Sequence, residues 1–155
     1  KDKTMENYSD YSWEVYEEVN HLGWIMGNMK GVNDFHDLQE FGATDAQYAV
    51  LRFEVQTAYQ KWLDAPVLVY VNAYRITRQY GGPEEGGWWF DCGEPLGSLP
   101  CTSQREARAQ VEEMQAKFKH LAEGDINSVL GGAEIRVYIE EEFARFYPET
   151  RPTYE

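Results

Sequence analysis

The chain has 155 residues, with 27 acidic and 14 basic side chains and a formal net charge of −13 at pH 7. Direct binding to nucleic-acid phosphates or to an anionic membrane needs clustered Lys and Arg, so this charge argues against both. Aromatic residues make up 15% of the chain, which is too many for an acidic disordered protein. We therefore expect a single domain, residues 1–155, with its own core. The acidity fits either a partner with a basic surface or solubility alone.

The two cysteines and the lack of long apolar runs indicate the compartment. Two cysteines are too few for a disulfide framework, which favours a reducing cytoplasm. No signal-peptide pattern and no apolar run of transmembrane length is visible, so we expect a cytoplasmic protein. The sequence begins at Lys1: either Met5 is the native start, with Lys1–Thr4 added before it, or further residues precede Lys1.

The N-terminal part, residues 1–65, is predicted to be helical. Asp10 can cap a first helix, and apolar residues follow it at helical spacing. This stripe consists of Tyr11, Val15, Val19, Leu22, Met26 and Met29. Gly23, Gly27 and Gly31 recur on another face, and an interior glycine weakens a helix by ~1 kcal/mol. We expect the helix to break near Gly23, rather than the three glycines to form a packing seam.

A second helical pattern follows a short segment of uncertain type. Residues 32–41 fit either a short helix or an irregular connector. Thr44 and Gln47 then form a capping-box pattern that opens the clearest helix of the chain. Its apolar stripe consists of Tyr48, Leu51, Val55, Ala58, Tyr59 and Trp62. Pro66 predicts its end near Asp64, because the residue before a proline avoids helical angles.

Residues 66–155 are predicted to form a ββαβ unit with a small sheet. Val67–Arg78 is rich in β-branched and aromatic residues and apolar on both faces, which is typical of a central strand. Trp88–Cys92 is the second strand of this hairpin. Gly93–Pro100, with two prolines and two glycines, is predicted to be a turn region. The fold class is therefore α+β, with N-terminal helices followed by the ββαβ unit.

The third helix and the last strand complete this unit. Ser103 and Glu106 form a second capping-box pattern, and Gly124 can terminate the helix. The stripe of this helix, predicted to cover one sheet face, consists of Ala107, Val111, Met114, Phe118 and Leu121. Glu134–Ile139 alternates as a strand. The segment after Ile139 is ambiguous, because Ile139, Phe143 and Phe146 also fit a helical turn.

The glycine-rich connection Tyr80–Trp89 is the candidate binding site. Two Gly-Gly pairs and a proline surround Glu84 and Glu85, and Trp88 and Trp89 follow directly. Loops carry binding residues more often than cores do, and Tyr and Trp are enriched at interface hot spots. Carboxylates beside them would speed association with a basic partner surface.

Two structural interpretations compete with this binding role. Side chains alternate along a strand, so Trp88 and Trp89 would place one ring in the core and one outside. Arg75 and Arg78 could pair with the loop carboxylates and only hold the loop in place.

Few residues offer catalytic chemistry. His36-Asp37 is the one dipeptide typical of metal-dependent phosphohydrolases, and His21 and His120 are the only other histidines. Such an enzyme is the alternative function, and a chance exposed pair is the simpler interpretation. No nucleophile elbow is visible, and the glycine-rich loop has no lysine and carries two carboxylates, which would repel phosphate.

A zinc site is equally poorly supported by the sequence. Cys92 and Cys101 with His120 could supply ligands, but their spacing matches no zinc motif and a fourth ligand is not evident. Cys92 fits a small core residue. We therefore expect neither a metal nor a cofactor.

Two segments resemble parts of small acidic bacteriophage proteins. They are RITRQYGGPEEGGWWFDC at Arg75–Cys92 and YPETRPTY at Tyr147–Tyr154, and the resemblance extends over residues 66–155. It implies a protein of the host-cell cytoplasm that acts on host machinery or on antiphage defence. It implies no activity and carries over no catalytic residue.

The patterns together predict a non-enzymatic binding protein, a phage-encoded inhibitor of a host or antiphage-defence protein. The expected partner is a host protein with a basic surface, and the oligomeric state is open. Carboxylates at phosphate-like spacing can also mimic nucleic acid. The acidic clusters that could do so, or could simply be solvated, are Glu14/Glu17/Glu18, Glu112/Glu113 and Glu140–Glu142.

Overall fold

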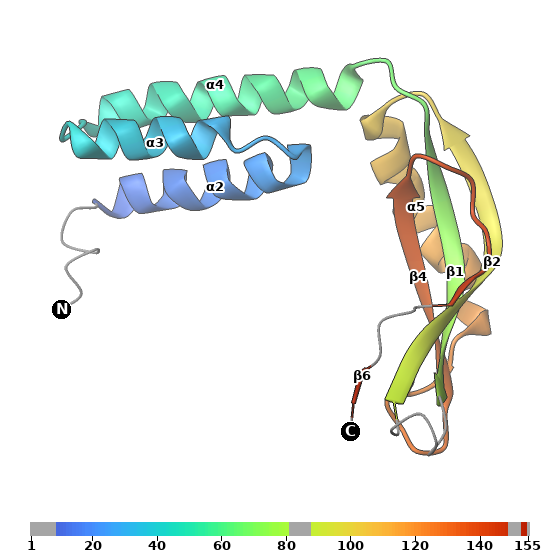
Figure 1. Cartoon of the computed structure of the whole chain (residues 1–155). Helices are drawn as coiled ribbons and strands as arrows, with labels where there is room; N and C mark the ends of the chain where they lie inside the picture. The colour runs from blue at the N-terminus through green and yellow to red at the C-terminus, as the bar shows by residue number, and fades with distance from the viewer. Residues whose placement is uncertain (1–8, 81–87, 149–152, 155) are drawn as a thin grey trace. The chain divides into compact units, whose positions relative to one another are not determined.

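A computed structural model describes residues 9–80, 88–148 and 153–154 of the chain. The chain divides into two compact units, Lys1–Asp64 and Ala65–Glu155, which we call the helical unit and the sheet unit (Figure 1). The boundary falls where the sequence predicts the change from the helical part to the ββαβ part. The α+β fold class is confirmed. No helix in the described ranges is long and apolar enough to cross a membrane.

Three helices form the helical unit: α2 (Asp10–Met26), α3 (Lys30–Glu40) and α4 (Asp45–Asp64). Each helix turns one apolar stripe towards the other two, as the 3.6-residue periodicity predicts. Their shared core consists of Val15, Val19, Leu22, Val32, Phe35, Tyr48, Leu51 and Val55. Of the two alternatives for residues 32–41, the helix is therefore correct.

The ends of α2 differ from the prediction. Ser9, not Asp10, is the N-cap: its backbone is extended and its hydroxyl accepts a hydrogen bond of 3.1 Å from the Ser12 amide. The expected break near Gly23 is also wrong, because α2 continues to Met26 and ends at Gly27, whose φ of 67° suits glycine. Gly23 has a different role. A Cβ there would lie 2.8 Å from the carbonyl oxygen of Asn28, so the glycine allows the chain to turn back tightly.

Close packing also explains a glycine in α3. A Cβ at Gly31 would lie 2.8 Å from Val55 Cγ2 and 2.9 Å from Val19 Cγ1. The glycine therefore lets α3 approach both neighbouring helices. At the start of α4 the predicted capping box is confirmed. The Thr44 amide donates to Gln47 Oε1 at 2.7 Å, and the Gln47 amide donates to Thr44 Oγ1 at 3.4 Å.

The sheet unit is an antiparallel sheet with one covering helix. Its strands lie in the order β3-β4-β1-β2-β5, and β6 pairs with the start of β2. Its elements are β1 (Val69–Tyr80), β2 (Trp88–Cys101), α5 (Gln104–Phe118), the 3₁₀ turn η2 (Lys119–Leu121), β3 (Glu123–Gly124), β4 (Gly132–Glu140), β5 (Tyr147–Pro148) and β6 (Thr153–Tyr154). β1 lies between β2 and β4, so its predicted central position is confirmed.

The expected turn at Gly93–Pro100 is wrong, because β2 continues through it to Cys101. Leu96 is an extra residue opposite the Ala73–Tyr74 step and forms a bulge in β2. β5 pairs only with Cys92 and Gly93, so β2 is the sheet edge beyond that point. Prolines are tolerated in such a place, because an edge strand need not donate every amide.

The prediction that α5 covers one sheet face is confirmed. Its residues Val111, Met114 and Phe118 pack on the cluster formed by β1, β2 and β4. Gly97 allows the approach, because a Cβ there would lie 3.2 Å from the Phe118 ring. The sheet residues of this cluster are Val69, Val71, Ala73, Leu96, Cys101, Val137 and Ile139.

The two ends of α5 differ in detail from the prediction. Ser103 Oγ caps the Glu106 amide at 3.2 Å, but the Glu106 carboxylate returns to the Thr102 amide, one residue earlier than expected. The helix ends at Phe118, so Gly124 does not terminate it and instead belongs to β3. β4 ends at Glu140, and of the two alternatives left open after Ile139 the helical turn does not form.

A buried asparagine joins the sheet to the chain that follows β4. Asn72 is fully buried on β1, and its Nδ2 donates to Glu140 Oε1 at 2.9 Å and to the Glu142 carbonyl at 2.7 Å. Ser98 Oγ donates to Asn72 Oδ1 at 2.6 Å and accepts from the Ala144 amide at 3.2 Å. We call these four side-chain bonds the Asn72 network. It satisfies the buried amide and fixes residues 141–144 against the sheet.

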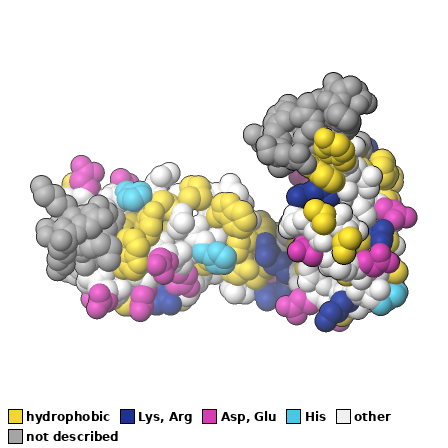
Figure 2. Space-filling view, turned by 90° about the horizontal axis from the view of Figure 1, so that it is seen from below, with side chains coloured by type: hydrophobic (Ala, Val, Ile, Leu, Met, Phe, Trp, Pro, Cys, Tyr) yellow, Lys and Arg dark blue, Asp and Glu magenta, His cyan; other side chains and the backbone are white. Residues whose placement is uncertain are grey.

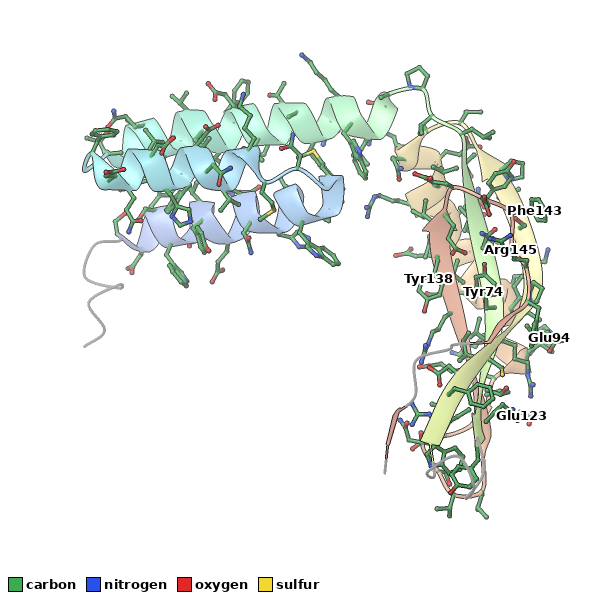
Figure 3. The ribbon with its side chains drawn as sticks, in the orientation of Figure 1. Tyr74, Glu94, Glu123, Tyr138, Phe143 and Arg145 are labelled. Carbon is green, nitrogen blue, oxygen red and sulfur yellow. The ribbon has the colours of Figure 1, made fainter. Side chains whose placement is uncertain are left out.

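Tyrosines extend this polar region. The Tyr74 hydroxyl donates to Glu140 Oε1 at 2.5 Å. Tyr138 lies beside Tyr74 on the neighbouring strand β4, with ring centroids 6.0 Å apart (Figure 3). One carboxylate therefore accepts bonds from two β1 side chains.

Candidate functional site

The predicted site is described in part. Glu84 and Glu85 lie outside the described residues, as does the side chain of Trp88, whose backbone begins β2. Tyr80 and Trp89 are directly opposite each other on β1 and β2, with ring centroids 4.8 Å apart. Tyr80 is 44% exposed and Trp89 is half-buried, so this ring pair presents an aromatic edge to solvent.

Arginines stabilise the strands behind this pair. The Asp91 carboxylate lies between two guanidinium groups, 3.4 Å from Arg78 Nε and 3.5 Å from Arg136 Nη1. Arg75 Nη2 lies 3.5 Å from Glu123 Oε2. The two arginines that could have held the loop carboxylates therefore have partners within the described part of the sheet.

The β3–β4 connection is a closed loop tied to the same end of the sheet. The Ser128 amide donates to the Asp125 carbonyl and the Gly131 amide to the Ser128 carbonyl, both at 2.9 Å. Asn127 receives a bond of 2.7 Å from Arg78 Nη1, which joins the loop to the end of β1. The pairing of β4 with β1 begins at Ala133, opposite Thr77, and in Figure 1 this loop and the end of β1 lie at the same end of the sheet.

Two apolar side chains project from this loop. Val129 is 101% exposed and Leu130 is 94% exposed, although the Leu130 amide is held by Ser128 Oγ at 3.2 Å. Sequence reasoning missed them. The available signal was an adjacent apolar pair within a loop rich in Asp, Asn, Ser and Gly. We call Tyr80, Trp89, Val129 and Leu130 the sheet tip.

The residues considered for the alternative enzyme belong to both units. His36 is exposed on α3, with its ring 5.8 Å from that of Tyr16. Asp37 lines a groove on the same unit, whereas His120 belongs to η2 of the sheet unit. Across residues 9–80, 88–148 and 153–154, no three His, Cys, Asp or Glu side chains are close enough to hold a metal ion. The geometry therefore offers no support for the phosphohydrolase alternative.

Both cysteines are free thiols within the sheet unit. Cys101 is buried and Cys92 is half-buried. Burial raises the pKa of each thiol above its ordinary value, and nearby carboxylates, Asp91 and Glu106 respectively, raise it further. Both thiols are therefore poor nucleophiles at neutral pH.

Several carboxylates of the acidic clusters are used internally. Glu18 pairs with Arg52 and accepts from Gln56 Nε2 at 2.6 Å. Glu142 Oε2 lies 3.1 Å from Arg145 Nη2, and the Glu140 carboxylate accepts a hydrogen bond in the Asn72 network. The Glu18 and Glu140 carboxylates are therefore directed towards the protein, whereas the Glu142 side chain stays 70% exposed in its ion pair with Arg145.

Comparisons of the chain with protein-family models, curated proteins and solved structures find no match. The binding properties of this protein must therefore be inferred from its own surface.

Proposed function

We propose that this chain is a non-enzymatic binding protein that contacts its partner through the sheet tip together with Glu84, Glu85 and Trp88. The exposure of Val129 and Leu130 on a hydrogen-bonded loop carries this proposal. Apolar side chains that are exposed to solvent become buried on binding, and a loop whose backbone is already hydrogen-bonded loses less conformational entropy when it binds. The aromatic pair beside them adds the residue types enriched at hot spots.

We further propose that the partner is a host or antiphage-defence protein with a basic surface and that this chain is its phage-encoded inhibitor in the host cytoplasm. The net charge of −13 supports a basic partner, because opposite charge speeds association. The resemblance of Arg75–Cys92 and Tyr147–Tyr154 to phage proteins supports the origin. Mimicry of nucleic acid is one way such an inhibitor could compete.

A matched pair of variants tests the contact surface. The change Val129→Asp with Leu130→Asp places two charges on the sheet tip. Val67→Asp with Leu68→Asp makes the same change at another exposed Val-Leu pair, 39% and 60% exposed, just before β1. In pull-downs from a bacterial lysate, the control variant should retain the proteins captured by the wild type, and the tip variant should lose them. Equal capture by both variants would contradict the proposed surface.

The captured partner then permits a test of the loop carboxylates. Glu84→Lys with Glu85→Lys should slow association and flatten its salt dependence, while the midpoint of thermal unfolding stays nearly unchanged. A sharp loss of stability with normal binding by the remaining folded protein would make the loop structural. Inhibition is tested separately, by adding the purified chain to an activity assay of that partner.

A further inference from the structure

A groove lies between α3 and α4 of the helical unit, with a volume of about 420 Å³. Leu38 and the buried Leu51 form its apolar floor. Phe41 and Val50 line it as well, and they remain 83% and 59% exposed. Large apolar side chains that line a groove and stay open to solvent are typical of a surface that a partner covers.

The charged groups that line this groove are all acidic. Asp34, Asp37 and Glu54 contribute three carboxylates. Within the described part of the chain, no Lys, Arg or His lies within the 4.0 Å ion-pair distance of them. Their charge is therefore available to a partner. Figure 2, seen from below, shows hydrophobic and acidic side chains next to one another on the face of the helical unit that is turned to the viewer.

The groove continues along α4. Asp34, Leu51 and Glu54 also line a narrower hollow of about 140 Å³ that reaches Ala58. At 1.5 Å per residue, the helix from Gln47 to Ala58 spans roughly 16 Å, or three turns. Lys30 lines the narrow end and is the one basic residue of the two hollows.

We propose that this groove binds a basic amphipathic helix of a partner protein. Apolar residues spaced at i, i+4 and i+7 on that helix span about 10 Å, or two turns, and would lie on the apolar floor. Lys or Arg residues beside them would reach the three carboxylates. The proposal goes beyond the function proposed for the sheet tip, because the groove belongs to the other unit and stands on its own contacts.

A labelled synthetic peptide tests the charge. The probe is a helical peptide of about 14 residues with Leu at i, i+4 and i+7 and Lys at the flanking positions. Fluorescence anisotropy with the full chain should show saturable binding. The triple change Asp34→Asn, Asp37→Asn, Glu54→Gln should raise Kd about tenfold or more at low salt. The control Glu14→Gln, Glu17→Gln, Glu112→Gln alters net charge equally at exposed positions that do not line the groove, and it should leave Kd nearly unchanged.

A second matched pair tests the apolar contact. Phe41→Ser should weaken peptide binding severalfold, whereas Phe53→Ser should not. Phe53 is 69% exposed and lines a different hollow, between α2 and α4. Circular dichroism verifies that both variants fold. If Phe41→Ser does not fold, Val50→Ser on the exposed side of α4 replaces it.

Four outcomes would overturn the proposal. They are no binding of the peptide by the wild type, equal binding of a scrambled peptide without the amphipathic pattern, equal weakening by the two charge triples, and self-association of the chain that Phe41→Ser abolishes. The third would mean general attraction to an acidic protein. The last, measured by sedimentation, would make a second copy the occupant of the groove.

Discussion

The helical unit and the sheet unit are stabilised by different kinds of contact. The core of the helical unit is a set of apolar side chains that recur every three or four residues along three helices. The sheet unit also has an apolar cluster under α5, but its opposite face buries the amide of Asn72, whose partner Glu140 lies 68 residues away. Local periodicity is thus enough to place the first core. The second depends on polar partners that only the folded chain brings together.

The largest expected loss of stability comes from removing the aromatic ring at the centre of the helical unit's core. Phe35 is fully buried, with its ring 5.0 Å from that of Tyr48 and 5.1 Å from that of Tyr16. Phe35→Ala should lower the free energy of unfolding by about 3–5 kcal/mol. Urea unfolding followed by far-UV circular dichroism measures the change. Phe53→Ala, at a 69% exposed position, should cost about 0.5 kcal/mol or less, and equal costs would show that the assigned core is wrong.

A substitution at a buried residue of the sheet unit should lower the stability less than Phe35→Ala does. Asn72→Leu removes the buried amide that pairs with Glu140, Glu142 and Ser98, and it leaves the half-buried Glu140 carboxylate with one bond fewer. We expect a loss of about 2–3 kcal/mol. Reaction of the buried Cys101 thiol with an alkylating reagent in urea reports unfolding of this unit separately. An equal loss for Gln79→Leu, at an exposed position of β1, would show that the network contributes little.

The close approach of the helices gives a third comparison. Gly31→Ala would force the new Cβ against Val19 and Val55, and overpacking should cost about 1–2 kcal/mol despite the better helix propensity of alanine. Val55→Ala in the same chain should relieve that contact. The double variant should therefore lose less stability than the sum of the two single variants. Strict additivity would mean that the helices separate without strain.

The smallest expected effect is a dependence of the sheet unit's stability on pH. Because burial raises the pKa of Cys101 in the folded state above its ordinary value of 9.0, the unfolded chain loses the thiol proton first. This contribution to stability is fully present below about pH 9 and is lost as the pH rises through the folded pKa. Urea midpoints measured from neutral to alkaline pH should fall less steeply for Cys101→Ala than for the wild type. Identical slopes would contradict the assignment.

Sequence alone determined most of the helical unit, because its signals are local. The stripes of α2 and α4 and the Thr44–Gln47 capping box involve residues within a few positions of one another. The apolar stripe of α5 and the two apolar faces that predicted a central position for β1 are also local signals. Gly23 misled the prediction because helix propensity describes an isolated helix, whereas the returning chain at Asn28 decides what fits there.

Tertiary structure decided the rest, because it depends on partners distant in sequence. The prolines of β2 are compatible with a strand only because that part of β2 is an edge, and the Asn72 network needs residues from three separate segments. For the site, the sequence predicted a hairpin with a glycine-rich connection, whereas the pairing of Tyr80 with Trp89 follows from the strand register of the folded chain. Glu84, Glu85 and Trp88 remain predictions. The exposure of Val129 and Leu130 and the groove between α3 and α4 follow from how closed loops and packed helices leave apolar side chains uncovered, which no periodicity encodes.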